Sequence, residues 1–251
     1  MTYWKLGSGG WATAPSWMPA SVHARTLQLS GAASGPANGQ NPGRLTTGAG
    51  SGAADAIAPL VVSGLCSRSA SQWTAGIVPA TPCATDHRVD DASGVAYDLH
   101  LTSPLRLYGP VGLRAFVSTT AHDGMVAARL EDVAPDGTVT QLTGGWQVLS
   151  LRALDRSRSR VVDGQVLQPY HPFTRASVLP VVSNEVYETD VELFPTGALL
   201  PAGHTLRVVL HAFDSPHLVA PLPQLANSAG LLSIHHDAAH PSQLVLPVQQ
   251  G

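Results

Sequence analysis

The first chemistry to test in this sequence is acyl transfer by a serine nucleophile. A nucleophile elbow needs Gly-x-Ser-x-Gly at a sharp strand-to-helix turn, where the serine Oγ is exposed. The nearest frame, Gly48-Ala49-Gly50-Ser51-Gly52, has Ala49 two residues before Ser51 and lies in low-complexity sequence. We interpret it as a flexible loop, so the residues themselves give no support for a serine hydrolase site.

Metal binding is the second chemistry, because the sequence has 11 histidines and concentrates several of them at residues 235–240. His236 and His240 stand at positions i and i+4, a spacing that suits zinc only on a helix. The flanking residues indicate strand and turn, and on a strand His235 and His236 point to opposite faces. We interpret these histidines as structural or surface side chains, with a metal site as the alternative.

Charged loop residues form a third group of candidates. Arg152 and the run Arg156–Arg160 could contact phosphate, but a net charge of −3 favours a solvated loop and no nucleic-acid binding. Asp123, and Asp214 with His217, lie where strands are expected to end. Such residues could bind calcium or sugar hydroxyls, although they more often cap turns.

The two cysteines, Cys66 and Cys83, are a candidate disulfide. A loop of this length would be stabilised by roughly 3 kcal/mol in the chain-entropy model, provided that the compartment is oxidising. There is no Cys-x-x-Cys, so redox catalysis has no support. The pair would suit an exported parent protein, yet residues 1–7 are not followed by the apolar region of a signal peptide. Localisation therefore stays open.

Composition predicts which elements must position these residues. Charged residues are 12% of the chain, against about 25% in an average soluble domain, while an apolar share of 44% excludes disorder. No apolar run approaches the ~20 residues that span a bilayer, so we expect no membrane partner. The 24 glycines and 20 prolines favour short strands joined by turns.

Alternating apolar residues predict strands that form an antiparallel sandwich or barrel. Pro135-Asp136-Gly137 is a strong turn signal, so residues 125–142 should form a hairpin. The other predicted strands are 95–101, 111–117, 145–151, 184–194, 204–213, 231–236 and 243–248.

Three segments differ in composition. Residues 1–29 are rich in tryptophan, residues 30–94 begin with a stretch dominated by Gly, Ala, Ser, Pro and Asn, and residues 95–251 hold the predicted strands. A stretch with so few large side chains cannot bury a core by itself. We therefore expect a loop or linker over 30–94 and a sandwich domain over 95–251.

Five short motifs follow one another after residue 97, and two more lie near the N-terminus. This order resembles the C-terminal domain of the X-Pro dipeptidyl-peptidase and cocaine esterase family of serine hydrolases. The later motifs are Ser103–Val111, Ser118–Gly137, Tyr187–Thr196, Pro201–Val208 and His240–Val248; the earlier ones are Trp4-Lys5-Leu6-Gly7 with Gly10-Trp11, and Ser16-Trp17-Met18-Pro19.

The resemblance implies an all-β fold, an antiparallel jelly-roll β-sandwich of the galactose-binding-like type. It also implies that residues 1–29 are the remnant of an α/β-hydrolase domain and of the crossover that follows it. In the family, the catalytic Ser, Asp and His all lie upstream of this region, and none has a matching position here. The resemblance therefore implies no catalytic residue and no cofactor in this chain, and a catalytic α/β-hydrolase domain as its partner.

The expected function is that of a non-catalytic domain that packs on such a hydrolase and helps to shape its substrate cleft. A carbohydrate- or ligand-binding sandwich is the alternative, although aromatic residues are only 6% of the chain; an autonomous enzyme with an unrecognised site is a third. Docking would explain the low charge, because interfaces are depleted in charged residues. We therefore expect an exposed apolar patch around Trp4, Trp11 and Trp17, and self-association of the isolated chain. The candidate interface residues are Trp4, Trp11, Trp17, Asp123, Asp214 and His217.

Overall fold

The computed structural model describes residues 1–7, 10–67, 70–77, 82–222 and 224–249, and its regular elements are mostly strands. None of the helices in these ranges is long and apolar enough to cross a membrane. The helices are α1 (Ala70–Trp73), α2 (Arg88–Asp91) and α3 (Leu225–Ser228). The strands are β1 (Thr2–Trp4), β2 (Leu6–Gly7), β3 (Trp11–Thr13), β4 (Val22–Ser30), β5 (Gly43–Thr46), β6 (Asp55–Ile57), β7 (Val95–His100), β8 (Leu105–Thr119), β9 (Met125–Val133), β10 (Val139–Val148), β11 (Arg160–Val162), β12 (Gln165–Gln168), β13 (Tyr187–Leu200), β14 (Thr205–His211), β15 (Leu232–His235) and β16 (Gln243–Gln249).

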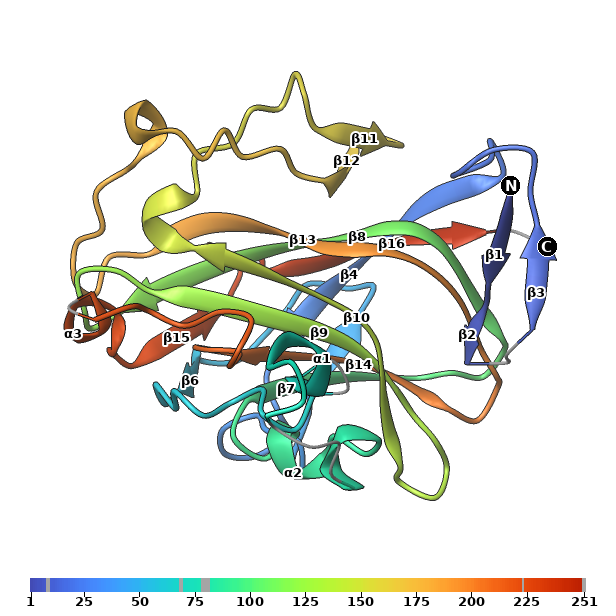
Figure 1. Ribbon diagram of the computed structural model, residues 1–251, viewed down its shortest axis with the longest axis horizontal. Coiled ribbons are helices and arrows are strands. Elements are labelled where there is room, and N and C mark those ends of the chain that lie inside the picture. The colour runs from blue at the N-terminus through green and yellow to red at the C-terminus, as the bar shows by residue number, and fades with distance from the viewer. Residues whose placement is uncertain (8–9, 68–69, 78–81, 223, 250–251) are drawn as a thin grey trace.

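The main sheet folds over on itself into a sandwich, as the sequence predicts. Its strand order is β10-β9-β14-β7-β5-β4-β16-β8-β13-β2, with β15 on β8 and β6 on β15. One layer holds β10, β9, β14 and β7, the other holds β4, β16, β8 and β13, and β5 joins them (Figure 1). Pairing is antiparallel except between β5 and β7 and between β13 and β2. The all-β, jelly-roll prediction is confirmed.

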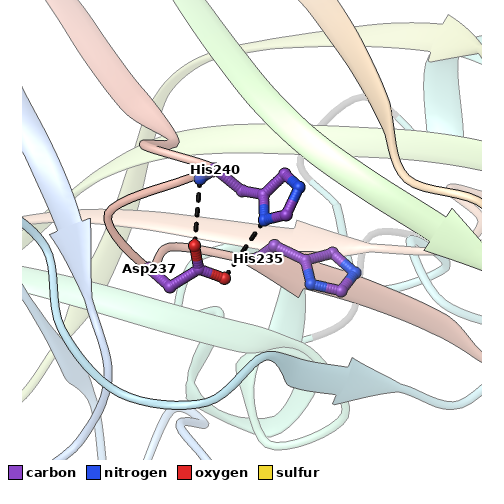
Figure 2. A group of neighbouring side chains, drawn as sticks. All are labelled: His235, Asp237 and His240. Atoms are coloured by element: carbon purple, nitrogen blue, oxygen red, sulfur yellow. Dashed lines mark hydrogen bonds and ion pairs between the residues drawn. The ribbon is translucent and has the colours of Figure 1, made fainter.

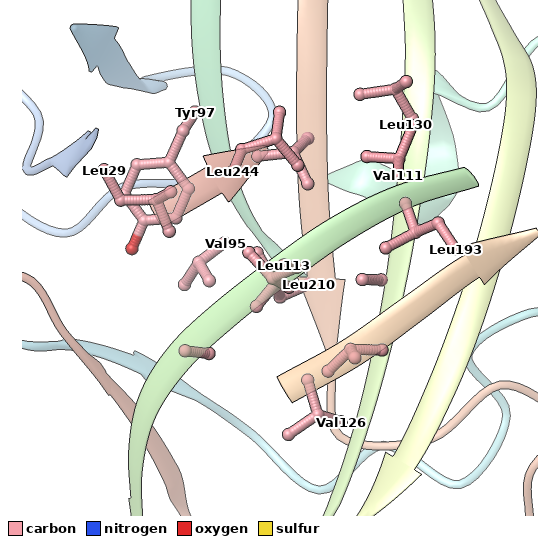
Figure 3. Close-up of a cluster of buried hydrophobic side chains, with 14 of the residues drawn as sticks. Leu29, Val95, Tyr97, Val111, Leu113, Val126, Leu130, Leu193, Leu210 and Leu244 are labelled. Atoms are coloured by element: carbon pink, nitrogen blue, oxygen red, sulfur yellow. The ribbon is translucent and has the colours of Figure 1, made fainter. Parts of the chain in front are cut away.

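The core lies between the two layers and is built by alternation along each strand. In β14, Leu206, Val208 and Leu210 are fully buried and point toward the opposite layer. Figure 3 shows Leu210 among core side chains from several other strands, including Leu113 of β8 and Leu244 of β16. Burying each of these side chains contributes about 1.5–3 kcal/mol, so this interior accounts for much of the stability of the sandwich.

The hairpin predicted over residues 125–142 is present as β9 and β10. The turn is closed by the Gly137 N–H, which donates to the Ala134 carbonyl, and by the Thr138 N–H, which donates to Asp136. Gly137 has φ +84°, a conformation that other residues rarely adopt. The strand predicted at 145–151 is the second half of β10 followed by a 3₁₀ turn at Leu149–Leu151, because a bulge keeps the two halves in one ladder.

The first 94 residues contribute strands to the same sheet, which differs from the expected start of the sandwich at residue 95. β4, expected within the N-terminal remnant, lies between β5 and β16, and β2 pairs with β13. The expected linker contains β5 and β6. Its glycines permit close packing: a Cβ on Gly43 would lie 2.5 Å from the Tyr97 ring, and one on Gly50 2.2 Å from the Leu29 carbonyl oxygen. Small residues here let backbone approach backbone, so they do not mark a free linker.

The described residues between 60 and 93, with α1 and α2, lie against the outer face of β7, β9 and β14 (Figure 1). Gly64 and Asp90 of this segment are buried, and the Gly64 N–H donates to the Asp90 carboxylate. The outer face of these strands would otherwise meet water. Covering it creates a second interior, which is polar, and places α1 beside the end of β14.

Candidate functional site

An aromatic groove runs along the edge where β10, β13 and α1 meet. Trp146 stacks on His217 with ring centroids 5.5 Å apart, and Trp73 packs edge-on against His217 at 4.9 Å. On the other side Trp146 contacts Phe194 at 5.4 Å. The groove encloses about 280 Å³ and its floor includes Asp214. The structure thus brings together the predicted residues Asp214 and His217 with two tryptophans to which the sequence assigned no role.

Exposed apolar side chains also occur on the segments next to this groove, and we call them together the docking surface. Ile77 is 85% exposed and Leu222 is 82% exposed. The two segments that carry them are held together because the Ser215 N–H donates to the Ser63 carbonyl and the Ser215 hydroxyl to the Val61 carbonyl. Residues 215–236 contain no Asp, Glu, Lys or Arg. The docking surface consists of Leu60, Val61, Val62, Leu65, Trp73, Ile77, Phe194, Val219 and Leu222.

Asp214 links the groove to a buried ion cluster beneath it. Its Oδ2 accepts the Trp146 indole N–H at 2.7 Å, and its Oδ1 accepts Arg129 Nη2 at 2.7 Å. Arg129 is 1% exposed and also pairs with Asp90. Burial would raise the pKa of Asp214, but the hydrogen bond from His217 and the charge of Arg129 outweigh it and lower the pKa to about 2. Asp214 is therefore an anion that fixes Trp146 and His217 in place.

A second buried cation, Arg207 of β14, holds α2, the helix of the segment that covers the outer face of β14. Its Nη1 donates to Asp91 at 2.9 Å and its Nε to Asp98 at 2.8 Å. Burial and the neighbouring Glu131 raise the pKa of Asp91 to about 8, and burial raises the pKa of Glu131 to about 7. Glu131 also contacts His87 Nδ1 at 3.2 Å. We infer that Asp91 and Glu131 share a proton at neutral pH, because two ionised carboxylates so close would repel.

In the structure a disulfide joins Cys66 and Cys83, at the two ends of the part of the cover that carries α1. Leu65, next to Cys66, lies on the docking surface, and the Ser67 carbonyl accepts the N–H of Ala70 at the start of α1. The bridge therefore restrains the segment that presents Trp73.

The predicted tryptophans of the N-terminus lie at the end of the molecule where β1 and β3 form a hairpin (Figure 1). Trp4 and Trp11 are 49% and 71% exposed and pack edge-on against each other. Trp17 is half-buried and contacts Tyr3 and Tyr108. Trp4 and Trp11 lie in the hairpin and Trp17 in the segment that follows it, whereas other elements build the docking surface. The predicted interface residues therefore lie at separate places on the molecule.

Asp123, the remaining predicted contact, is engaged within its own loop. Its Oδ1 accepts the N–H groups of Gly124 and Ser150 at 2.8 and 3.0 Å, and its Oδ2 accepts the Ser150 hydroxyl at 2.6 Å. These bonds cap the turn between β8 and β9 and tie it to the residues after β10. The arginine run leads from a loop into β11, and in the loop Arg158 stacks over the ring of Tyr170 at 3.7 Å.

The histidine segment 235–240 follows the strand alternation that the sequence predicts. His236 points into the core and its Nε2 lies 2.8 Å from Asp55 Oδ2. His235 points the other way, with Nε2 2.8 Å from the Ser118 hydroxyl. The turn after β15 brings His240 back, so that His240 Nδ1 lies 3.2 Å from Asp237 Oδ2 (Figure 2). One donor atom each of His235, Asp237 and His240 lies within 4.8 Å of the other two.

Ser118 and His235 have the contact of a serine nucleophile and its base, but the rest of a triad is missing from their surroundings. Asp237 accepts the N–H groups of Ala239 and His240 with Oδ1 and contacts the His240 ring with Oδ2, so its carboxylate faces His240 and does not orient the His235 ring. Ser118 is 9% exposed and lies within the long strand β8. A nucleophile must be reachable by its substrate and followed by an oxyanion site. This pair orients a ring and does not form an acylation site. Ser51 is bonded to Ser30 in a loop against β4.

The sequence model of one family matches most of this chain. It is described as the X-Pro dipeptidyl-peptidase C-terminal non-catalytic domain and covers residues 1–245. A protein of Mycobacterium bovis named as a serine esterase is 30% identical over 186 residues, which is 72% of this chain and 28% of that protein. The cocaine esterase of a Rhodococcus species is 26% identical over 161 residues, 59% of this chain and 24% of that enzyme. The chain therefore spans about a quarter of the length of these relatives.

A solved structure agrees with the family match at the level of the fold. A CocE/NonD family hydrolase from Staphylococcus aureus superimposes with a TM-score of 0.67 over 98% of this chain and 40% of that one, at 18% sequence identity. This likeness shows the sandwich fold alone. With the family model matched along nearly the whole length, the chain belongs to the family of X-Pro dipeptidyl-peptidase C-terminal non-catalytic domains.

Proposed function

We propose that this chain serves as the non-catalytic sandwich of a serine esterase or peptidase, and that it packs on an α/β-hydrolase domain through the docking surface. The hydrolase domain would supply the nucleophile, the base and the acid of an acyl-serine mechanism. This chain would supply a rigid wall beside the substrate cleft, with the aromatic groove at the contact.

The observation that carries this proposal is the docking surface itself. An exposed apolar area marks a place where another protein binds, and the part of this area within residues 215–236 carries no charged side chain. Trp73 and Phe194 have the character of interface anchors, since aromatic side chains often dominate binding energy. The buried Asp214 and Arg129 hold the groove from below, so the contact would be preformed. The same groove could hold a sugar ring, which makes glycan binding an outcome that would overturn this assignment.

The test is co-expression with a hydrolase domain. The reading frame upstream of Met1 is sequenced, and any α/β-hydrolase segment with a Gly-x-Ser-x-Gly elbow is co-expressed with this chain. We expect the two to co-purify and to hydrolyse nitrophenyl esters together, whereas this chain alone should give no turnover. An upstream frame without a hydrolase, or turnover by the isolated chain, would refute the proposal.

Matched substitutions locate the contact. Ile77→Asp places a charge on the docking surface and should weaken co-purification by about tenfold or more, because a buried unpaired charge costs several kcal/mol. Val182→Asp is the control, since Val182 is 55% exposed on a loop outside the surface. The isolated chain should associate with itself in sedimentation experiments, and Ile77→Asp should shift it toward monomer. Equal behaviour of the two variants would place the contact elsewhere.

A further inference from the structure

The structure assigns a divalent transition-metal site, of the zinc class, to His235, Asp237 and His240 at the turn between β15 and β16. This site is independent of the docking surface and of the proposed hydrolase partner. Its donors are two imidazoles and one carboxylate, the set that zinc takes when a fourth position is left to water. Calcium and magnesium prefer oxygen donors alone.

The geometry of the three donors supports the assignment. Asp237 Oδ2 and His240 Nδ1 lie 3.2 Å apart, which is close to the edge of about 3.3 Å expected for a tetrahedron with metal–ligand bonds near 2.0–2.1 Å. The donor atom of His235 lies within 4.8 Å of both, so all three donors gather around one point beside the turn. All three side chains are half-buried, which leaves a path for the ion.

The surroundings hold these donors in place before any ion arrives. The Asp237 carboxylate is fixed by the N–H groups of Ala239 and His240, at 2.7 and 3.0 Å. The Ser242 hydroxyl donates to the His235 carbonyl and accepts the Phe116 N–H, which pins both ends of the turn to the sheet. A preformed ligand set loses little conformational entropy when it binds a metal.

Ser118 acts as the positioning residue of this site. Its hydroxyl lies 2.8 Å from His235 Nε2, so Nδ1 of the same ring is left as the metal donor. Metal-bound histidines almost always use their second nitrogen in this way. At His240, binding through Nδ1 places the ring proton on Nε2, and the carboxylate of Asp237 turns from the ring to the ion.

The test is equilibrium dialysis of the full chain, without a histidine tag, against Zn²⁺ at pH 7.5. We expect one Zn²⁺ per chain. Loss of an outer partner of a metal ligand weakens affinity by about 10- to 100-fold, so Ser118→Ala should fall in that range and His240→Ala should lose at least as much. His122→Ala, an exposed histidine on another loop, should bind like the parent chain.

Co²⁺ gives a second readout, because its visible absorption reports the coordination geometry of the bound ion. A site with two imidazoles and a carboxylate should give the intense visible absorption of four-coordinate Co²⁺, and this absorption should disappear in His235→Ala and in His240→Ala. The assignment is overturned if Zn²⁺ fails to bind with one-to-one stoichiometry, if His240→Ala keeps the parent affinity, or if Ca²⁺ displaces Zn²⁺.

Discussion

The proton shared by Asp91 and Glu131 predicts an unusual dependence of stability on pH. Asp91 has a pKa of about 8 in the folded chain and an ordinary value of 3.8 without these surroundings. Between these values the folded chain holds a proton that the unfolded chain has released. The free energy of unfolding must therefore fall as pH rises, and this contribution is lost by the time pH has passed 8.

The magnitude follows from one proton. Each pH unit over which one proton separates the two states changes the unfolding free energy by about 1.4 kcal/mol. From pH 7 to pH 9 the folded carboxyl passes from mostly protonated to mostly ionised, so the expected loss is about 1.4 kcal/mol in total. This window lies above the titration of the buried histidines His87 and His211: burial lowers their pKa values in the folded chain, and their ordinary pKa of 6.5 leaves them mostly neutral when unfolded.

The variant Asp91→Asn isolates this effect. An asparagine mimics the protonated acid, because its carbonyl can accept from Arg207 and its amide can donate to Glu131. We expect its unfolding free energy to be flat between pH 7 and pH 9 where that of the parent chain falls. Urea unfolding at the two pH values, followed by tryptophan fluorescence, measures both slopes.

Asp136→Asn is the control for the chemical change itself. Asp136 lies on the turn between β9 and β10, and hydrogen bonds from Thr138 lower its pKa, so it is ionised throughout the window and its variant should keep the parental slope. If Asp91→Asn retains the parental slope, or if the parent chain is flat over this window, Asp91 is not protonated at neutral pH and the reasoning about the ion cluster is wrong.

Two further predictions concern the first 94 residues. Gly43→Ala should destabilise the sandwich by about 1–3 kcal/mol in urea unfolding, because the new Cβ would meet the Ser30 carbonyl and the Tyr97 ring at 2.5 Å; Gly48→Ala, where the nearest atom is 3.7 Å away, should change stability little, and equal effects would mean that the segment is not packed as described. Unfolded, unreduced protein should show no titratable thiol, and reduction should lower stability by roughly 3 kcal/mol in the chain-entropy model; two thiols in the unreduced sample would contradict the bridge between Cys66 and Cys83.

The strands after residue 95 could be predicted because their apolar residues alternate and their turns carry clear signals. The strands β5 and β6 could not, since each is three or four residues long and lies among small residues. Too few side chains are present there to show a period of two. A glycine that permits close packing and a glycine that permits flexibility look the same in one sequence.

The candidate site was predictable only in part, for a related reason. Alternation in β14 places Arg207 and His211 opposite Leu206, Val208 and Leu210, and a charged second face normally meets water. Here α2 and its neighbouring residues cover that face, so Arg207 becomes buried and needs Asp91 and Asp98. The sequence shows which residues share a face, but the segment that covers this face lies elsewhere in the chain.

The cluster of His235, Asp237 and His240 could also be predicted only in part, because strand alternation does not show where the turn after the strand leads. The spacing of His236 and His240 directs attention to a helical zinc pair, and strand alternation correctly argues against it. The alternation also separates His235 from His236, and the turn capped by Asp237 then returns His240 to the side of His235. Asp-x-x-His directly after a strand was the available signal, because an aspartate that caps a turn brings the third residue after it back toward the strand.

The few charged residues of the chain are divided unevenly between the interior and the surface. Seven of the 17 acidic residues are buried, against two of the 14 basic residues, within the part of the chain that the structure describes. The interior therefore holds an excess of carboxyl groups, and the outer surface carries fewer charges than the composition alone implies. A surface this poor in charge hydrates weakly, and residues 215–236 form a stretch of it without any charged side chain. An isolated sandwich gains nothing from such a surface, whereas a sandwich that is covered by a catalytic domain avoids the cost of desolvating charges when the two pack together.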